Sequence, residues 1–333
     1  MKKSLKWEFW PFWVFYIPVY MHWLWYSLKS RSLVFFSVAN PAMNLGGFSS
    51  YSKFKILELI PQEVVPAMFL LESVDYENVH QLRIKHGITF PLIAKPDLGE
   101  RGFGVALIRS EDDLQEYLFT AKNDIIIQEY IDYPLELGVM YHRFAGEKQG
   151  EITSVVMKEF LSVVGDGVST MAELFKKGKR TFYHIELLYG MYINQLDHVI
   201  AKGKEVQLQE IGNHSRGTTF LNANHLINEQ MHQVFDEVAL QIDGFYFGRF
   251  DLRVPSIDSL YRGENIKILE LNGAASEPAH IYDPEMKLFT AYKDLFRHWK
   301  NLYLVSTKNK IAGHQYTPFL KAYKEHMNYF KTR

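Results

Sequence analysis

The chain has 333 residues, with 37 Lys and Arg against 38 Asp and Glu, so its formal net charge is −1. This length predicts two or three subdomains rather than one small core, and the lack of a basic stripe beside the aromatic residues argues against nucleic acid as a partner. The chain contains no cysteine, which excludes disulfides, thiolate zinc sites and cysteine nucleophiles and agrees with a reducing compartment.

Residues 9–28 form an uncharged run in which half of the positions are Phe, Trp or Tyr. Twenty uncharged residues can just span a bilayer, but Trp and Tyr prefer the headgroup level, and Pro11 and Pro18 interrupt the run. We therefore expect a monotopic, interfacial anchor that meets the cytoplasmic face of a membrane through residues 7–28. A single N-terminal span, an apolar contact in a homodimer and a core helix of a soluble protein are the alternatives.

The next segment, to residue 87, predicts a short α/β unit. A strand is expected at 33–39, a helix at 51–60, a second strand at 64–71 and a helix at 74–86 that is closed by Gly87.

A strand predicted at 88–95 ends in Lys95 and is followed by a loop that contains Gly99, Gly102 and Gly104. The backbone amides of such a loop can approach phosphate oxygens because no Cβ is in the way. A plain hairpin turn is the alternative. The lysine precedes the loop, so the segment is not a Walker A motif.

The middle of the chain alternates between strand and helix patterns. A capping box, Thr170-Met-Ala-Glu173, predicts the start of one helix. The remaining predicted elements are a helix at 112–121, strands at 124–130, 139–144 and 152–164, and helices at 228–242, 284–303 and 319–330.

Residues 244–280 contain two alternating apolar runs on either side of a polar loop, a pattern that predicts paired strands. Arg249 and Asp251 share a face of the first strand, and Glu270 and Asn272 share a face of the second. A hairpin would place these four groups on one surface, which is costly without a partner. Mg²⁺ prefers such oxygen donors, whereas a solvated hairpin face with an Arg–Asp pair is the alternative.

The sequence Gly-Arg-Phe-Asp, followed by Leu-Glu-Leu-Asn-Gly, resembles the magnesium-binding strands of the ATP-grasp superfamily, of which D-alanine–D-alanine ligase is a member. The resemblance implies that Asp251, Glu270 and Asn272 hold Mg²⁺ and that Arg249 faces the reacting carbonyl. Lys-Pro before a glycine-rich loop matches the same superfamily. It implies that the following residues bind ATP phosphates: Lys95, Gly99, Arg101, Gly102 and Gly104.

Three further segments resemble members of this superfamily. The strand Ile-Ile-Ile-Gln-Glu-Tyr and its exit resemble the adenine hinge, which implies nucleotide contacts by Gln128, Glu129, Tyr130 and Ile131 and a ribose contact by Glu136. Gly-Asp-Gly-Val-Ser-Thr at 165–170 resembles cyanophycin synthetase and the bifunctional glutathione synthetases, and it implies that Lys158 contacts the γ-phosphate. The loop at 212–218 resembles a loop of the same enzymes and implies that Arg216 lies near the phosphates or a substrate carboxylate.

The segment Ala-Ser-Glu-Pro-Ala-His at 275–280 stands where D-alanine ligases have a loop that touches the second substrate. By that resemblance Ser276, Glu277 and His280 would contact the amine substrate. Their chemistry differs from the family loop, so we expect an amine other than D-alanine.

The resemblance covers residues 88 to about 300 and implies an α+β, ATP-grasp fold whose two subdomains hold ATP between antiparallel sheets. It implies an ATP- and Mg²⁺-dependent carboxylate–amine ligase that forms an acyl phosphate. A kinase on the same fold and a membrane-anchored nucleotide-binding protein without turnover are the alternatives. The expected domains are an anchor at 1–30, an α/β unit at 31–87, a small subdomain at 88–136, a catalytic subdomain at 137–303 and a helical tail at 304–333.

The anchor also bears on the substrates, because an enzyme held at a surface gains effective concentration toward other molecules confined there. We therefore expect at least one small-molecule or lipid-linked carboxylate or amine that is associated with the membrane.

Overall fold

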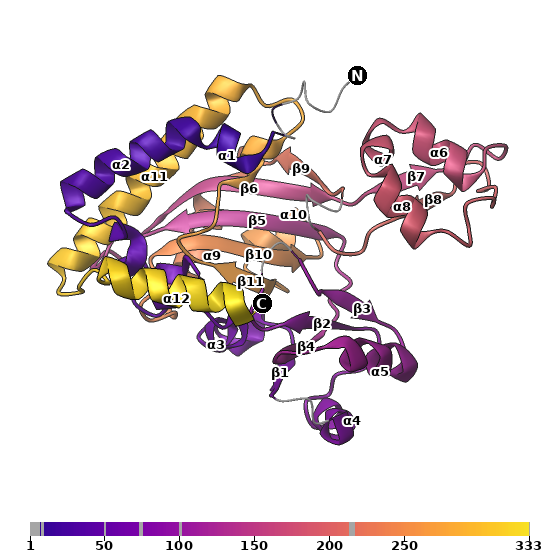
Figure 1. Ribbon diagram of the computed structural model, residues 1–333, viewed down its shortest axis with the longest axis horizontal. Helices are drawn as coiled ribbons and strands as arrows, with labels where there is room; N and C mark the ends of the chain where they lie inside the picture. The colour runs from indigo at the N-terminus through magenta and orange to yellow at the C-terminus, as the bar shows by residue number, and fades with distance from the viewer. Residues whose placement is uncertain are drawn as a thin grey trace.

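Antiparallel strands form the framework of the protein, as predicted for the α+β class (Figure 1). The structure is a computed structural model that describes Trp7 and residues 10–49, 51–72, 76–99, 102–212 and 217–332. Within these residues the strands form a five-stranded sheet, a four-stranded sheet and a two-stranded ribbon.

The five-stranded sheet has the strand order β11-β10-β5-β6-β9. One of its faces is apolar because side chains alternate along each strand, and the helices α9 (Glu229–Leu240) and α10 (Ile257–Tyr261) contribute to the core on that side. The opposite face carries the charged residues of the hairpin. The strands are β5 (Leu135–His142), β6 (Glu151–Glu159), β9 (Thr219–Asn222), β10 (Phe247–Val254) and β11 (Lys267–Asn272).

The four-stranded sheet has the order β1-β4-β2-β3 and packs against α4 (Tyr76–Lys85) and α5 (Glu111–Thr120) through one apolar cluster. Its strands are β1 (Met68–Leu71), β2 (Leu92–Pro96), β3 (Ala106–Ile108) and β4 (Ile125–Glu129). Strand β1 pairs with β4, so the strand predicted at 64–71 joins the sheet of the following predicted subdomain.

A small lobe stands apart from both sheets (Figure 1). It contains β7 (Ser162–Val164), β8 (Glu205–Gln207), α6 (Met171–Lys177), α7 (Lys179–Tyr183) and α8 (Ile185–Met191), and it has its own apolar cluster. The predicted capping box is confirmed, since the Thr170 hydroxyl accepts from the Glu173 amide and the Glu173 carboxylate accepts from the Thr170 amide.

The strand predicted at 33–39 is wrong, because the chain forms a 3₁₀-helix, η3 (Phe35–Val38), followed by a second, η4 (Asn44–Gly47). The backbone turns sharply here, with φ of 47° at Leu45 and 68° at Gly46. A Cβ on Gly46 would lie 2.2 Å from the Phe36 carbonyl oxygen, so only glycine permits this approach.

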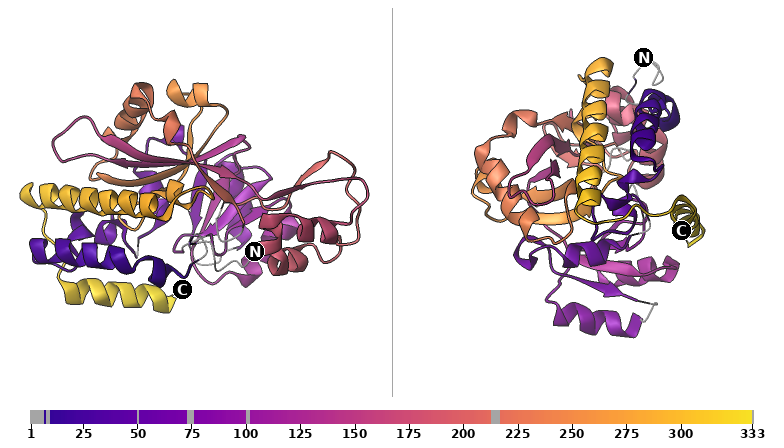
Figure 2. Two further views of the ribbon diagram at one scale, coloured as in Figure 1. Left: turned by 90° about the horizontal axis from the view of Figure 1, so that it is seen from above. Right: turned by 90° about the vertical axis from the view of Figure 1, so that its left-hand side faces the viewer.

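The aromatic N-terminal run forms two helices, α1 (Phe12–Phe15) and α2 (Ile17–Ser30), that meet at Tyr16. Helix α2 lies beside the long helix α11 (Leu288–Ile311), and the last helix, α12 (Phe319–Thr332), lies on the same outer side (Figures 1 and 2). One face of the run is buried while Trp13, Trp25 and Leu28 are more than half exposed. Among the described residues, no helix has the length and apolar character needed to cross a membrane.

Four short elements remain within the part of the chain that the structure describes. They are α3 (Lys53–Glu58), η5 (Gln62–Val64), η7 (Asn224–Leu226) and η8 (Ala279–Tyr282).

The fully buried Asn40 ties the N-terminal segment to the start of β10. Its amide nitrogen donates to the carbonyls of Gly46 (2.9 Å) and Phe247 (2.7 Å), and its oxygen accepts from the amides of Tyr246 and Phe247, both at 2.9 Å.

We expect Asn40→Ala to lower the free energy of unfolding by about 3 kcal/mol, because it leaves several buried backbone groups without a partner. Urea denaturation measures the loss, with Asn194→Ala at an exposed position as the control. Equal stability of the two variants would contradict this role of Asn40.

Candidate active site

The hairpin β10–β11 brings the four predicted side chains together. Asp251 lies opposite Glu270 and Arg249 lies opposite Asn272. The Arg249 guanidinium donates to the Asp251 carboxylate (Nη2–Oδ2 2.9 Å), and the Asn272 amide nitrogen donates to the same oxygen (2.9 Å). The alternation predicted from the sequence therefore holds, and the roles of the four residues stay predictions.

A second row of charges lies beside this group, on β5, β6 and β10. Lys158 Nζ lies 2.9 Å from Glu136 Oε1 and 3.3 Å from Asp251 Oδ1, so one ammonium bridges two carboxylates. Arg253 Nε donates to the other oxygen of Glu136 at 2.9 Å. Both carboxylates are buried and each has cationic partners, which is how buried charges persist in a protein.

The electrostatics of Asp251 follow from these contacts. Burial by itself raises the pKa of Asp251, but the positive charges of Arg249 and Lys158 outweigh it, and the net pKa lies below the usual range. Burial by itself lowers the pKa of Lys158, but the negative charges of Asp251 and Glu136 outweigh this effect, and the net shift is upward. Asp251 and Lys158 are therefore both ionised at neutral pH.

Glycines leave room for the charged side chains. A Cβ on Gly138 would lie 3.0 Å from Asp251 Oδ1, and a Cβ on Gly212 would lie 2.3 Å from Glu136 Oε1. Larger residues at these two positions would displace the carboxylates.

Lys95 links the two large sheets. Its ammonium, carried on β2, donates to Gln128 Oε1 on β4 (2.9 Å) and to the carbonyl of Leu269 on β11 (3.0 Å). The register of β10 and β11 shifts so that Leu269 has no partner residue, and the carbonyl is free to accept from Lys95. Burial lowers the pKa of Lys95 to about 8.

Helix α3 adds a second lysine to this region. Asp97 Oδ1 accepts from the Phe54 amide (2.8 Å) and from the Ser52 hydroxyl, which fixes the start of α3. Lys53 Nζ then lies 3.9 Å from Glu270 Oε1.

The predicted adenine-hinge residues point in different directions. Gln128 contacts Lys95, whereas the Glu129 carboxylate accepts from the backbone amide of Ala67. Gln128, and not Glu129, therefore faces the lysine. The Ile131 carbonyl accepts from Arg253, whose guanidinium lies 5.4 Å from the centre of the Tyr130 ring.

The glycine-rich loop connects β2 to β3. Gly102 and Gly104 have positive φ angles of 68° and 70°, a conformation that glycine adopts without strain. Gly99 faces Lys53, since a Cβ there would lie 3.8 Å from the lysine nitrogen. Arg101 and Arg216, both predicted site residues, lie outside the described residues.

The loop predicted to touch the amine substrate follows β11. Ser276 donates to the Gly273 carbonyl (2.6 Å), and the backbone carbonyl of Glu277 accepts from Arg249 Nη1 (3.2 Å). His280 is buried, with one ring nitrogen 2.7 Å from the Ser154 hydroxyl and the other 3.0 Å from Asp294. In this structure both of its nitrogens are therefore engaged by the protein.

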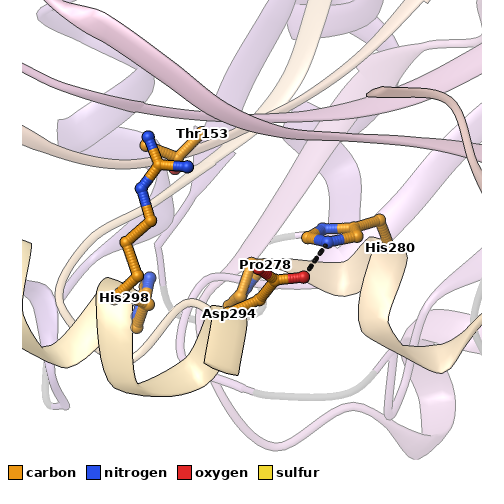
Figure 3. Close-up of a pocket in the computed structure, with 6 residues that line it drawn as sticks. Thr153, Pro278, His280, Asp294 and His298 are labelled. Carbon is orange, nitrogen blue, oxygen red and sulfur yellow. Dashed lines mark hydrogen bonds and ion pairs between the residues drawn. The ribbon is translucent and has the colours of Figure 1, made fainter. Parts of the chain in front are cut away.

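Figure 3 shows the cavity behind that loop, between Thr153 on β6, Pro278 and His280 on the loop, and Asp294 and His298 on α11. Its volume is about 10 Å³, room for a single water molecule. The cavity cannot hold a substrate. Its lining residue His280 anchors the loop through its contacts with Ser154 and Asp294.

Two cations of this surface, Lys53 and Arg253, are absent from the sequence predictions. Arg253 lies two residues after Asp251 on the same strand, so the alternation that identified Arg249 and Asp251 also points to it. Lys53 carried no comparable signal, because only the folded chain brings α3 to β11.

Comparison with known families identifies one part of the chain. Residues 50–137 match the model of the RimK-like ATP-grasp domain. The match bears out the predicted resemblance to the ATP-grasp superfamily over this part of the chain.

Curated relatives match over parts of their length. The glutathione biosynthesis bifunctional protein GshAB of Streptococcus agalactiae serotype V is 23% identical over 219 residues, which are 59% of this chain and 28% of that protein. The inositol-tetrakisphosphate 1-kinase of Danio rerio is 36% identical over 95 residues, 28% of this chain and 21% of that protein. The chain thus spans less than a third of the length of either relative.

Solved structures that resemble the chain include two ligases. D-alanine–D-alanine ligase from Bacillus anthracis covers 81% of this chain and 72% of its own, with 14% identity and a TM-score of 0.48. The VanG D-Ala:D-Ser ligase from Enterococcus faecalis covers 76% of this chain and 61% of its own, with 17% identity and a TM-score of 0.44.

The hairpin has the donor chemistry that Mg²⁺ requires. Among the described residues no group of three or more His, Cys, Asp or Glu could hold a metal ion. A metal here would take two carboxylates, Asp251 and Glu270, and the Asn272 amide oxygen, after the Asn272 side chain turns from its orientation in this structure, in which its nitrogen donates to Asp251. Such a set fits Mg²⁺, which completes its octahedron with water or phosphate oxygens. The missing Cβ at Gly138 lets the Asp251 carboxylate lie close to the backbone of β5.

We expect Lys95→Ala to weaken ATP binding by about 1.5–3 kcal/mol through the loss of charge-assisted contacts. Calorimetry on both proteins measures the difference, and Lys122→Ala, at an exposed position of the same subdomain, is the matched control.

Because the pKa of Lys95 is about 8, its ammonium deprotonates as the pH rises through that value. The wild-type affinity should therefore fall above that pH while the variant stays flat; unchanged affinity would contradict the assignment.

Proposed function

We propose that this protein is an ATP- and Mg²⁺-dependent carboxylate–amine ligase that works through an acyl phosphate. The observation that carries the proposal is the convergence of cations from both sheets on the hairpin of Asp251 and Glu270. Lys95 reaches it from the four-stranded sheet, and Lys158 and Arg249 reach it within the five-stranded sheet. A nucleotide triphosphate placed between the sheets would meet these charges together.

The nucleotide would lie along the edge between the two sheets. The buried Gln128 has an amide nitrogen with no hydrogen-bond partner among the described residues, and an adenine ring nitrogen could accept from it. Glu136 would bind the ribose hydroxyls. Lys95 and the glycine-rich loop would hold the phosphates, because no side chain at Gly102 or Gly104 blocks the approach of phosphate oxygens to the backbone amides.

Asp251, Glu270 and Asn272 would hold Mg²⁺. When bound, the ion would neutralise charge on the transferring phosphoryl group. In this structure Lys158 and Arg249 form ion pairs with the Asp251 carboxylate. With the metal bound to Asp251, these two cations would be available to bind the γ-phosphate.

In the first step a carboxylate oxygen of the substrate attacks the γ-phosphorus, the bond to the β-phosphate oxygen breaks, and ADP leaves with that electron pair. Lys95, Lys158 and Arg249 offset the charge that accumulates on the phosphoryl oxygens. In the second step an amine attacks the acyl carbon, inorganic phosphate leaves, and the amine loses a proton. Arg249 would stabilise the oxyanion, and closure of the glycine-rich loop would exclude water.

A second candidate is a kinase that phosphorylates a hydroxyl on the same fold. The match to an inositol-tetrakisphosphate 1-kinase, at 36% identity over 95 residues, favours it. The two functions differ in their products, because a ligase releases inorganic phosphate and a kinase does not.

We expect Asp251→Asn and Glu270→Gln each to abolish most ADP formation while the far-ultraviolet circular dichroism stays unchanged. The substrates for the assay are the small molecules that copurify with the wild-type protein, once mass spectrometry has identified them. Asp258→Asn, at an exposed position, is the control and should keep full activity. Full turnover in both site variants would overturn the metal assignment.

We further propose that the N-terminal helices lie on the cytoplasmic face of a membrane and that at least one substrate is membrane-associated. Large apolar side chains on the outer face of α1 and α2 are exposed to solvent, and no charged residue interrupts them between residues 9 and 28. They include Trp13, Ile17, Met21, Trp25 and Leu28. Lys29 and Arg31 follow, and the Lys29 ammonium lies 4.9 Å from the Trp25 ring centre, a composition suited to the headgroup region.

A triple variant, Trp13→Gln, Trp25→Gln and Leu28→Gln, should reduce flotation with vesicles of phosphatidylcholine and phosphatidylglycerol. Each buried large apolar side chain contributes about 1.5–3 kcal/mol, so binding should fall at least tenfold. Phe119→Gln is the control, because Phe119 is 89% exposed but lies on α5, which packs on the four-stranded sheet away from the N-terminal helices. Unchanged flotation, or conversion of a dimer to a monomer in place of lost flotation, would contradict the membrane assignment.

A further inference from the structure

Tyr16, at the junction of α1 and α2, reaches the loop beside the candidate active site. The side chain is 5% exposed, and its hydroxyl donates to Glu277 Oε1. The neighbours Phe15 and Val19 pack against α11 in the same apolar cluster. Apolar packing against α11 and the hydrogen bond to Glu277 therefore fix the position of the junction and of the Tyr16 hydroxyl.

Glu277 connects this junction to Arg249. Its carboxylate accepts from Tyr16 and, at 2.9 Å, from the Tyr282 hydroxyl, while its backbone carbonyl accepts from Arg249 Nη1 at 3.2 Å. One residue therefore binds the N-terminal segment through its side chain and the site arginine through its backbone. Burial raises the pKa of Glu277 to about 7, although the hydrogen bond from Tyr282 by itself lowers this pKa.

The rest of the loop is fixed at its two ends. Near β11 the amides of Ala274 and Ala275 donate to the carbonyls of Gly46 and Gly47, at 3.0 and 3.2 Å. At the far end His280 lies between Ser154 and Asp294, as Figure 3 shows for the aspartate. Between these ends, Tyr16 and Tyr282 hold the Glu277 carboxylate.

We propose that Tyr16 and Tyr282 are positioning residues for the reaction: they hold Glu277, and through its carbonyl they set the orientation of Arg249. The N-terminal aromatic segment is then part of the active site and not only a means of attachment. The inference rests on the proposed function for its catalytic meaning, while the positioning itself can be measured without turnover.

The test uses the full chain labelled with ¹⁵N-arginine. The Nε–Hε signal of Arg249, assigned with Arg249→Lys, reports on the orientation of the guanidinium, which donates through Nε to Asp251 and through Nη1 to the Glu277 carbonyl. Tyr16→Phe removes one hydroxyl and should shift this signal, as should Glu277→Gln. Tyr20→Phe makes the same change at a half-exposed side chain on the same segment and should leave the signal in place.

Amide hydrogen exchange in residues 274–283 provides a second measurement. It should become faster by up to about tenfold in Tyr16→Phe, the equivalent of one lost hydrogen bond. An unmoved Arg249 signal in Tyr16→Phe, or an equal shift in Tyr20→Phe, would overturn the proposal. If Tyr16→Phe does not fold, Tyr282→Phe is the alternative variant, because it removes the hydrogen bond to the other carboxylate oxygen of Glu277. A shifted signal in a protein that has no ligase activity would leave the positioning intact and reject the proposed function.

Discussion

Two buried carboxylates, Glu136 and Asp251, share the ammonium of Lys158, and the polar face of the five-stranded sheet depends on this contact. A buried carboxylate without a cation would take up a proton or destabilise the fold. Arg249 and Arg253 complete the charge balance on either side. The same cations that stabilise the carboxylates in this structure are those that the proposed reaction would use for phosphate, so stability and ligand binding compete for the same groups.

The contacts between the two large sheets include an apolar cluster and two lysines. Lys95 crosses from β2 to the bulged residue Leu269 on β11, and Lys53 reaches Glu270 from α3. Both lysines lie next to the predicted metal ligands. A nucleotide bound between the sheets would replace protein–protein contacts with protein–phosphate contacts, which is a direct route from binding to movement of one sheet against the other.

Sequence patterns predicted the parts of this molecule that are governed by local periodicity. Alternation placed Arg249, Asp251, Glu270 and Asn272 on one surface, and the capping box at Thr170 placed a helix start. The patterns failed where distant segments decide the outcome. The apolar run at 33–39 resembles a strand, but a sharp glycine turn and the buried Asn40 fold it into 3₁₀-helices. Nothing local shows that Tyr16 lies beside Glu277, 261 positions away.

We propose that this charged surface activates a carboxylate by phosphorylation. The most direct test uses the copurifying carboxylate with ¹⁸O in its carboxyl group, incubated with ATP, amine and the wild-type protein. We predict that the inorganic phosphate released carries an ¹⁸O atom, because the acyl phosphate passes a carboxylate oxygen to phosphorus before the amine displaces it. Unlabelled phosphate, or a phosphorylated hydroxyl with no phosphate released, would contradict the account.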